Sequence, residues 1–239
     1  MNENNSTDAC AEGWGLQLKE WLDEDEYRHY ARLRLLDKIN KKFAFKSFLD
    51  VGCGSGRLLR NYKEKGVESV GLELAKEIIK YHAGHRYTPV VQGGAQQLPF
   101  ISDAFDFVTC LGLIEHLPDP QSAITELFRV TKPGGMALIT VPNMVGPFPF
   151  FVPLWYLSGE RYRFGWKNMV GSMYTRGSLK KELEFSGWVV ESVSPFKGSS
   201  LLEWAKVPFN TSLAEFIEGN MFVSKLFGIM LAAVCRKPS

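Results

Sequence analysis

The chain has 239 residues, of which 45% are hydrophobic and 23% are charged, and its formal net charge is +2. These values are ordinary for a folded globular protein and exclude a highly charged disordered chain. With so small a net charge and no run dense in lysine and arginine, the sequence indicates no nucleic-acid partner.

The cysteines and the apolar stretches indicate in which cellular compartment the protein is expected. The four cysteines are scattered without a Cys-x-x-Cys spacing, which argues against a disulfide framework or zinc site and favours a reducing cytoplasm. Residues 145–157 and 226–234 are apolar but far shorter than the roughly 20 residues of a membrane-spanning helix. Contact with a bilayer surface stays open, so we expect a cytoplasmic protein with or without membrane association.

Residues 1–12 are rich in asparagine and are predicted to be disordered, whereas residues 13–239 are predicted to form a single domain. Apolar residues over 14–42 recur at helical spacing, so residues 13–45 are expected to form an N-terminal helical cap. The acidic run at 23–26 either separates two helices or starts the second.

From residue 47 short apolar segments alternate with helical ones, which is typical of a doubly wound α/β sheet. The expected strands are 47–51, 67–73, 89–92, 105–111 and 136–141, and the expected helices are 57–65, 74–82 and 120–130. The run Pro133-Gly134-Gly135 is expected to be a turn, and His82 and His85 are expected to lie at the surface.

After residue 143 this regularity ends. Residues 148–166 contain eight aromatic side chains in 19 positions. We interpret residues 144–174 as an insertion after the fifth strand, either a lid that binds an acceptor or an extra layer of core. A helix at 175–186 with Thr175 as its N-cap, a strand at 188–193, a short helix at 212–218 and a closing strand at 230–235 complete the prediction.

A glycine-rich turn, Gly52-Cys53-Gly54-Ser55-Gly56, joins the first strand to the following helix. Such a turn lets a ligand approach bare backbone at the carboxyl end of a strand. A dinucleotide fingerprint needs Gly-x-Gly-x-x-Gly, whereas the third residue after Gly54 is Arg57. Glu73 ends the second strand 17 residues after Gly56, where a carboxylate can accept hydrogen bonds from both hydroxyls of a ribose. The glycine spacing therefore opposes a nicotinamide cofactor.

Five motifs in the same order resemble those of class I S-adenosylmethionine-dependent methyltransferases of the type 11 kind, over roughly residues 45–195. They lie at 48–59, 70–74, 98–100, 105–117 and 127–141. The stretch 105–120, which contains Glu115-His116-Leu117, is similar to the ubiquinone-biosynthesis O-methyltransferase branch. The run Lys132-Pro133-Gly134-Gly135 is similar to a turn common in the superfamily.

The resemblance implies a Rossmann-like, seven-stranded sheet with an antiparallel last strand and with S-adenosylmethionine across the ends of the first, second and fourth strands. Glu73 would bind the ribose and Leu74 would flank the adenine. The other implied cofactor-binding residues are Asp50, Gly52, Cys53, Gly54 and Gly56 near the methionine end, Gly94, Ala95 and Gln96 along the adenine edge, and Cys110, Leu111 and Gly112 beneath the methionine.

Two glycines depart from the family pattern. Gly94 stands where the family often has an aspartate that accepts a hydrogen bond from the adenine amino group. Gly112 replaces the first acid of the Glu-x-x-Glu-His run that the ubiquinone branch carries as a metal site. Glu115 and His116 alone make a poor metal site, so we predict no metal.

S-adenosylmethionine carries its reactive methyl group on a positively charged sulfonium, which determines what the protein must supply. Its methyl group is already activated, so the enzyme mainly has to hold the acceptor in line with it. A general base is needed only where the acceptor must lose a proton. His116 is the candidate, because an imidazole titrates near neutral pH; the alternative is that His116 caps or packs against the next helix. Glu115 is interpreted as a charge at a helix end or in a loop.

The sequence therefore predicts methyl transfer from S-adenosylmethionine to a small, apolar acceptor, on oxygen. The aromatic residues favour a lipid or prenylated ring, from which a peripheral membrane contact would follow. One alternative is a non-catalytic S-adenosylmethionine-binding or scaffold protein, and a less favoured one is a nicotinamide-dependent oxidoreductase. The oligomeric state is not specified by the sequence.

Overall fold

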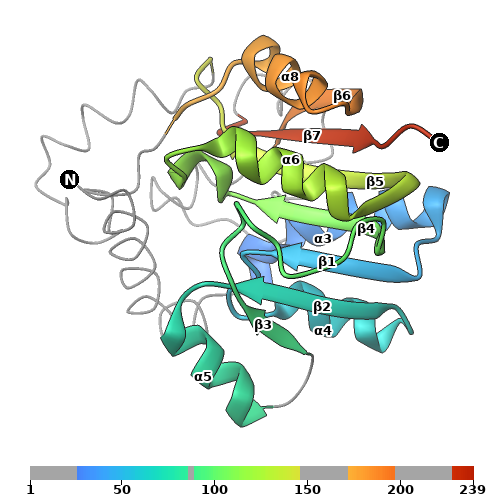
Figure 1. The fold of residues 1–239 in the computed structure, drawn as a ribbon, viewed down its shortest axis with the longest axis vertical. Helices are drawn as coiled ribbons and strands as arrows, with labels where there is room; N and C mark the ends of the chain where they lie inside the picture. The colour runs from blue at the N-terminus through green and yellow to red at the C-terminus, as the bar shows by residue number, and fades with distance from the viewer. Residues whose placement is uncertain (1–25, 86–88, 146–171, 197–227) are drawn as a thin grey trace, which may run out of the picture.

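The computed structural model describes residues 26–85, 89–145, 172–196 and 228–239. Within them, seven strands form one sheet in the order β3-β2-β1-β4-β5-β7-β6. Strands β1 to β5 pair in parallel, and β7 runs antiparallel to both β5 and β6 (Figure 1). The strands are β1 Ser47–Val51, β2 Glu68–Glu73, β3 Val90–Gln92, β4 Phe105–Leu111, β5 Thr131–Pro142, β6 Val189–Phe196 and β7 Met230–Arg236. The predicted doubly wound sheet with an antiparallel last strand is confirmed.

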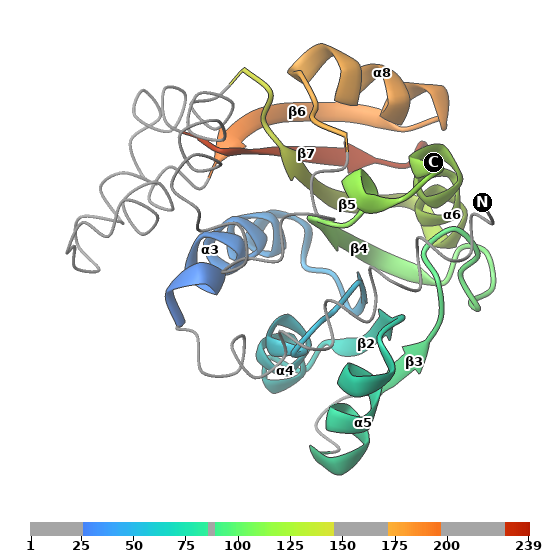
Figure 2. The same cartoon turned by 90° about the vertical axis from the view of Figure 1, so that its left-hand side faces the viewer.

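The described helices lie on both faces of this sheet. They are α3 Glu26–Phe43, α4 Arg57–Glu64, α5 Lys76–His85, the short 3₁₀ helix η1 Ile114–His116, α6 Pro120–Val130 and α8 Arg176–Phe185. Helices α3 and α4 cover one face, and α6 and α8 cover the other (Figure 2). Each face has its own apolar core, in which Phe48 and Tyr62 are buried on the first side and Leu127 and Leu183 on the second.

Local capping explains where two helices begin. Asp119 caps α6, because its carboxylate accepts a hydrogen bond from the Ser122 backbone N–H at 3.2 Å. Thr175 caps α8 in a reciprocal box with Ser178, each side-chain oxygen accepting from the other residue's backbone N–H at 3.0 Å. The predicted N-cap is therefore confirmed.

Two boundaries differ from the prediction for physical reasons. Strand β5 begins at Thr131, because Thr131 already pairs with Phe105. The predicted glycine turn is an irregularity within this strand, since the register shifts and the next pair joins Phe107 to Met136. Helix α5 begins at Lys76 instead of residue 74, because the two preceding N–H groups donate to Glu73.

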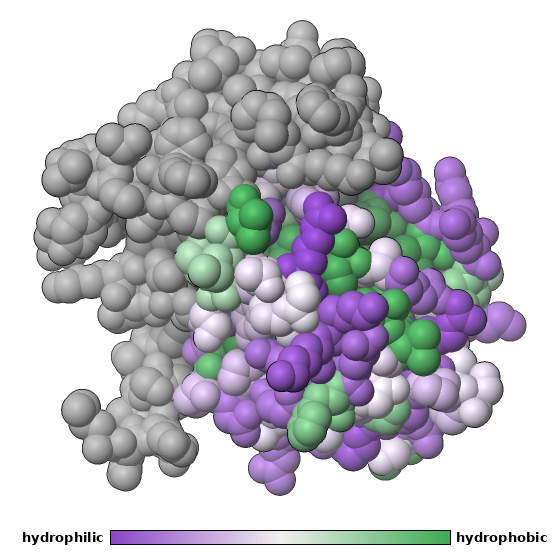
Figure 3. Space-filling view, turned by 90° about the horizontal axis from the view of Figure 1, so that it is seen from above, coloured by the Kyte–Doolittle hydropathy of each residue, from purple (hydrophilic) through white to green (hydrophobic). Residues whose placement is uncertain are grey.

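Several expectations lie wholly or partly outside the described residues. These are the disordered start at 1–12, the first half of the helical cap, residues 148–166 of the insertion and the helix at 212–218. The described remainder of the cap is α3, which is joined to α4 where the Tyr62 hydroxyl donates to Asp37 at 2.9 Å. On the face seen from above, the described surface is largely hydrophilic with separate hydrophobic patches (Figure 3).

Candidate functional site

The glycine turn follows β1 directly and has a conformation that requires glycine. Gly52, Gly54 and Gly56 have φ angles of +74°, +50° and +68°, a region that side-chain-bearing residues rarely adopt. The backbone N–H groups of Gly52 and Cys53 donate to the Leu72 carbonyl at 2.8 and 3.1 Å, which joins the turn to β2. Backbone is therefore presented at the shared carboxyl end of β1 and β2, where ligands of open α/β sheets bind.

Glu73 lies beside this turn at the end of β2, with its carboxylate held by three backbone donors. Its Oε2 accepts from the Gly54 N–H at 3.1 Å, and its Oε1 accepts from Leu74 and Ala75 at 2.7 and 3.0 Å. The side chain is only partly buried. The two acceptor sites of Oε1 are occupied, whereas Oε2 keeps one for a ribose hydroxyl. The Glu73 side chain therefore contacts Gly54, and the Leu74 N–H helps to orient it.

His82 is buried, so the prediction that it lies at the surface is wrong. Only 7% of this residue is exposed, and its Nε2 lies 2.7 Å from the Gly54 carbonyl oxygen. A Cβ on Gly56 would lie 2.5 Å from the His82 Cε1 atom, so the ring packs directly against the turn. The side chain of His85 lies outside the described part of the chain.

Asp50 is buried in β1 directly before the turn. Its Oδ1 accepts a hydrogen bond from the Thr109 hydroxyl of β4 at 2.7 Å. Burial raises the pKa of Asp50 to about 6, because the charged form loses its hydration, while Thr109 and Arg32 oppose the shift. This carboxyl is therefore close to its titration range at physiological pH.

The end of β4 supplies the floor of the site. Cys53 and Cys110 are buried, and burial raises the pKa of both thiols, which makes them packing residues instead of nucleophiles. Leu111 is half-buried and ends the strand. Gly112 follows with φ +73°, and its N–H donates to the Thr140 carbonyl at 2.9 Å.

Glu115 is buried in η1 with only 3% of its side chain exposed, so it is not a loop charge. Its Oε2 is buried and has no hydrogen-bond partner, and a Cβ on Gly112 would lie 3.6 Å from its Oε1. Burial raises the pKa of Glu115 to about 8, opposed by a backbone hydrogen bond and Arg32. The carboxyl is consequently protonated at neutral pH and reaches the predicted methyl end of the site.

His116 follows Glu115, and its Nε2 lies 3.8 Å from the Glu115 Oε1. Burial lowers the pKa of His116 to about 4, because the imidazolium would lose its hydration. At neutral pH this contact therefore joins two uncharged groups and is not an ion pair. The uncharged imidazole can accept a proton at neutral pH. The prediction from the sequence that its pKa lies near neutral pH is wrong.

Arg32 of α3 is a residue that sequence reasoning missed. Its charge lowers the pKa values of both Asp50 and Glu115, and a Cβ on Gly112 would lie 3.9 Å from its Nη2. One guanidinium thus lies near two buried carboxyls at the predicted methionine end. Helical spacing identifies α3 but does not indicate which of its several cations faces the sheet.

The predicted adenine edge follows β3. Ala95 is buried, and the Gln96 side-chain nitrogen donates to the Asp119 carbonyl at 3.2 Å. A Cβ on Gly94 would meet nothing within 4 Å, so this position borders open space.

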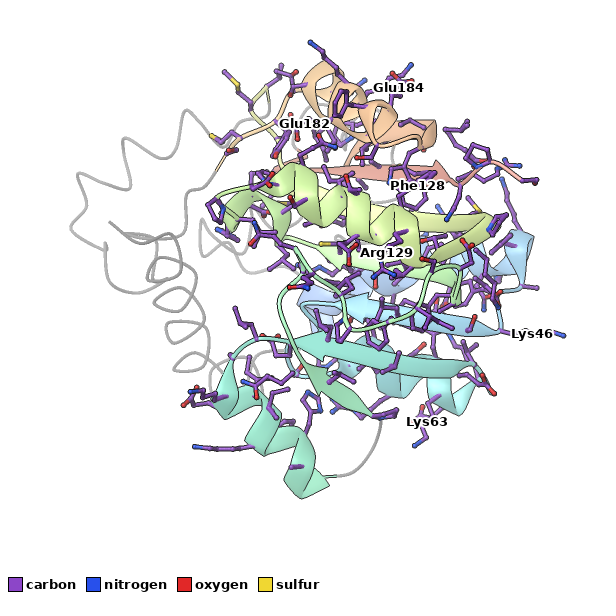
Figure 4. The ribbon with its side chains drawn as sticks, in the orientation of Figure 1. Lys46, Lys63, Phe128, Arg129, Glu182 and Glu184 are labelled. Carbon is purple, nitrogen blue, oxygen red and sulfur yellow. The ribbon has the colours of Figure 1, made fainter. Side chains whose placement is uncertain are left out.

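Helix α6 fixes the loop that carries this edge. The Arg129 guanidinium donates to the carbonyls of Leu98 and Phe100 at 3.0 and 2.8 Å, and Glu126 accepts from the Leu98 N–H at 2.7 Å. Figure 4 shows Arg129 on the side of α6 that faces this loop. The motif at 98–100 therefore anchors the loop after β3, which is the predicted adenine edge, to α6.

The ends of the predicted insertion return to the site. Tyr174 pairs with Asn143 in an isolated bridge, and the Ser172 N–H donates to the Glu115 carbonyl at 2.9 Å. Asn143 also donates through its side chain to the Gly228 carbonyl at 2.9 Å, and Phe196 lies opposite Met230 across the β6–β7 ladder. The flanks of both 146–171 and 197–227 therefore lie at the carboxyl end of β5, next to η1.

The described residues contain neither a metal-binding cluster nor a membrane-spanning helix. No group of three or more His, Cys, Asp or Glu side chains in the described ranges is arranged to hold a metal ion. No helix in this part of the chain is long and apolar enough to cross a membrane.

Comparisons with known proteins agree with this geometry. Residues 49–139 match the family model described as a methyltransferase domain. The chain is 34% identical over 137 residues to the ubiquinone biosynthesis O-methyltransferase of Chromobacterium violaceum, across 52% of this chain and 58% of that protein. The predicted resemblance is confirmed, and with the fold it implies S-adenosylmethionine as the cofactor. The chain spans about half the length of the curated relatives it matches.

Solved structures share the fold at lower identity. A methyltransferase dependent on S-adenosylmethionine from Archaeoglobus fulgidus has a TM-score of 0.61 at 24% identity, covering 91% of this chain and 99% of its own. The [4+2]-cyclase SpnF has a TM-score of 0.57 at 17% identity, covering 86% of this chain and 80% of its own. Because one neighbour is named a cyclase, the fold alone does not specify the reaction.

Proposed function

We propose that this protein is an enzyme that transfers a methyl group from S-adenosylmethionine to an oxygen atom of a small, apolar acceptor. The observation that carries the proposal is the carboxylate of Glu73, which is held by Gly54 beside the glycine turn, within the segment that matches the methyltransferase domain. The main alternative is a non-catalytic S-adenosylmethionine-binding or scaffold protein, because a cofactor can bind without being consumed.

The residues of the site fit each part of this cofactor. Glu73 offers an oriented carboxylate oxygen for a ribose hydroxyl, and the open space at Gly94 leaves room along the adenine edge. The buried carboxyl of Asp50 favours the positive charges of the methionine end when it is ionised, whereas Arg32 suits the carboxylate of the methionine. Each part of the ligand therefore has a candidate partner in the site.

The chemistry needs little from the protein beyond positioning. When bound, the cofactor supplies a methyl group whose carbon bonds to the acceptor oxygen while the sulfur keeps the electron pair of the broken bond. The acceptor hydroxyl must lose its proton, and His116 is the proposed acceptor of that proton through a ring nitrogen. Burial keeps the imidazole uncharged at neutral pH, so it is in the correct form before each turnover.

The proposed acceptor is a hydroxylated, lipid-like ring. The aromatic-rich residues 148–166 fall between described flanks that lie next to η1, which supports a role in covering an apolar acceptor. The relatives named for ubiquinone biosynthesis support the same acceptor class and methylation on oxygen. A peripheral contact with a membrane would give the enzyme access to such a molecule.

The test is transfer of a labelled methyl group into fractionated cell extract. Incubation with S-adenosylmethionine labelled in its methyl group should place the label in the lipid fraction and form S-adenosylhomocysteine in equal amount. Label found only in protein or water-soluble molecules would contradict the apolar acceptor. Tight cofactor binding without transfer to any fraction would support the scaffold alternative.

A further inference from the structure

Helix α5 carries a buried histidine that contacts the cofactor turn from outside the ligand-binding edge. The His82 Nε2 lies 2.7 Å from the carbonyl oxygen of Gly54, and the residue is 7% exposed. Because a carbonyl oxygen only accepts, the ring nitrogen must be the donor, which fixes the proton on Nε2. The contact spans 28 residues, so it joins two separate elements.

Gly54 is also held on the other side of its Cα atom. The Gly54 N–H donates to Glu73 at 3.1 Å while the Gly54 carbonyl accepts from His82. Glu73 also holds the two N–H groups that precede α5. The turn and α5 are thus joined twice, once through the proposed ribose ligand and once through the histidine.

Packing adds a second constraint on the turn. A Cβ on Gly56 would lie 2.5 Å from the His82 Cε1 atom and within 3.4 Å of both ring nitrogens. Gly56 precedes α4 at φ +68° and has no side-chain capping bond of its own. The ring therefore occupies the space beside this glycine and limits the movement of the turn.

We propose that His82 is a positioning residue that holds the glycine turn in its cofactor-binding conformation before the cofactor arrives. This inference rests on the proposed function, because it assigns His82 to the affinity of that same site. A turn that is already ordered binds more tightly, since apparent affinity falls with the fraction of molecules in the competent state.

The test compares two substitutions that differ in hydrogen bonding. His82→Phe keeps a ring but has no donor, whereas His82→Gln keeps an N–H at similar reach. We expect His82→Phe to weaken S-adenosylhomocysteine binding about tenfold, and His82→Gln to stay within about threefold of the wild type in calorimetry. Equal affinity of His82→Phe and the wild type would overturn the proposal.

Ile78 provides the matched control, because it is fully buried on the same face of α5, four residues earlier. Ile78→Val should lower Tm without changing the affinity for S-adenosylhomocysteine. If Ile78→Val weakens binding as much as His82→Phe, His82 acts only through helix stability and the proposal is wrong. If the wild type fails to bind S-adenosylhomocysteine, the proposed function fails together with this inference.

A second measurement needs no variant. In the ligand-free wild type, the Gly54 amide should already exchange slowly with deuterium, because its N–H donates to Glu73 and the next peptide unit is held by His82. Rapid exchange of that amide until S-adenosylhomocysteine is added would contradict preorganisation, even if His82→Phe does not fold.

Discussion

The backbone N–H of Gly54 donates to the Oε2 atom of Glu73 at 3.1 Å, which joins the turn after β1 to the acid that ends β2. This contact orients the carboxylate before any ligand is present. An acid at a strand end has many accessible rotamers, and three backbone donors select one of them. The proposed ribose site is therefore built by the fold itself.

Glu73→Gln should weaken S-adenosylhomocysteine binding by about 10- to 100-fold, because hydrogen bonds to a charged acceptor contribute about 1.5–3 kcal/mol. In the variant, the side-chain NH₂ group of glutamine would also face backbone N–H groups that donate to the carboxylate in the wild type. Calorimetry measures the change. Glu68→Gln is the matched control, since Glu68 is exposed on the same strand, and it should leave affinity unchanged.

Gly94→Asp should strengthen binding, in the range of about three- to tenfold. A side chain at this position meets open space, and a carboxylate there can accept from the adenine amino group. Gly84→Asp introduces the same charge at another open position, on α5, and should have no effect. Weaker binding by Gly94→Asp would show that the adenine lies elsewhere.

Glu115 should make the stability of the protein depend on pH. Its folded-state pKa of about 8 exceeds the ordinary value of 4.5, so the folded protein binds this proton more tightly than the unfolded chain. The contribution is fully present below pH 4.5 and is lost as the pH rises toward 8, at up to about 1.4 kcal/mol per pH unit.

Glu115→Gln mimics the protonated acid and should remove this dependence. In urea unfolding, the variant should gain stability relative to the wild type between pH 6 and pH 8. Asp50, the other buried acid of the site, has a pKa of about 6. The interval from pH 6 to pH 8 lies above that value. Glu77→Gln, on the exposed surface of α5, serves as the control. A constant difference between Glu115→Gln and the wild type across this interval would contradict the raised pKa.

His116→Ala should retain S-adenosylhomocysteine binding and lose about 10²–10⁴-fold in turnover, which is the usual contribution of a general base. With a pKa lowered to about 4, His116 is deprotonated well below neutral pH. Turnover by the wild type should consequently show no loss of activity near pH 6.5 from this group. A variant with full turnover would assign His116 to packing alone.

Much of the sheet was predictable from the sequence. The strands at 47–51 and 105–111 are mostly apolar segments that have the observed bounds, and Glu73 follows from its place at a strand end. These patterns are local, because a few neighbouring residues are enough to identify a buried parallel strand or a glycine turn.

The missed features depend on contacts between distant elements. His82 is buried because α5 packs against the glycine turn, which lies 28 residues earlier in the chain. Arg32 meets the end of β4 only after α3 packs on the sheet. The lowered pKa of His116 results from burial, which no sequence spacing reports.

The central claim is that the glycine turn and Glu73 bind S-adenosylmethionine. Calorimetric titration of the wild-type protein with S-adenosylmethionine, S-adenosylhomocysteine and NAD tests it most directly. The site described above predicts saturable binding of both sulfur nucleosides with one ligand per chain, and no binding of NAD. Binding of NAD, or failure to bind either sulfur nucleoside, would contradict it.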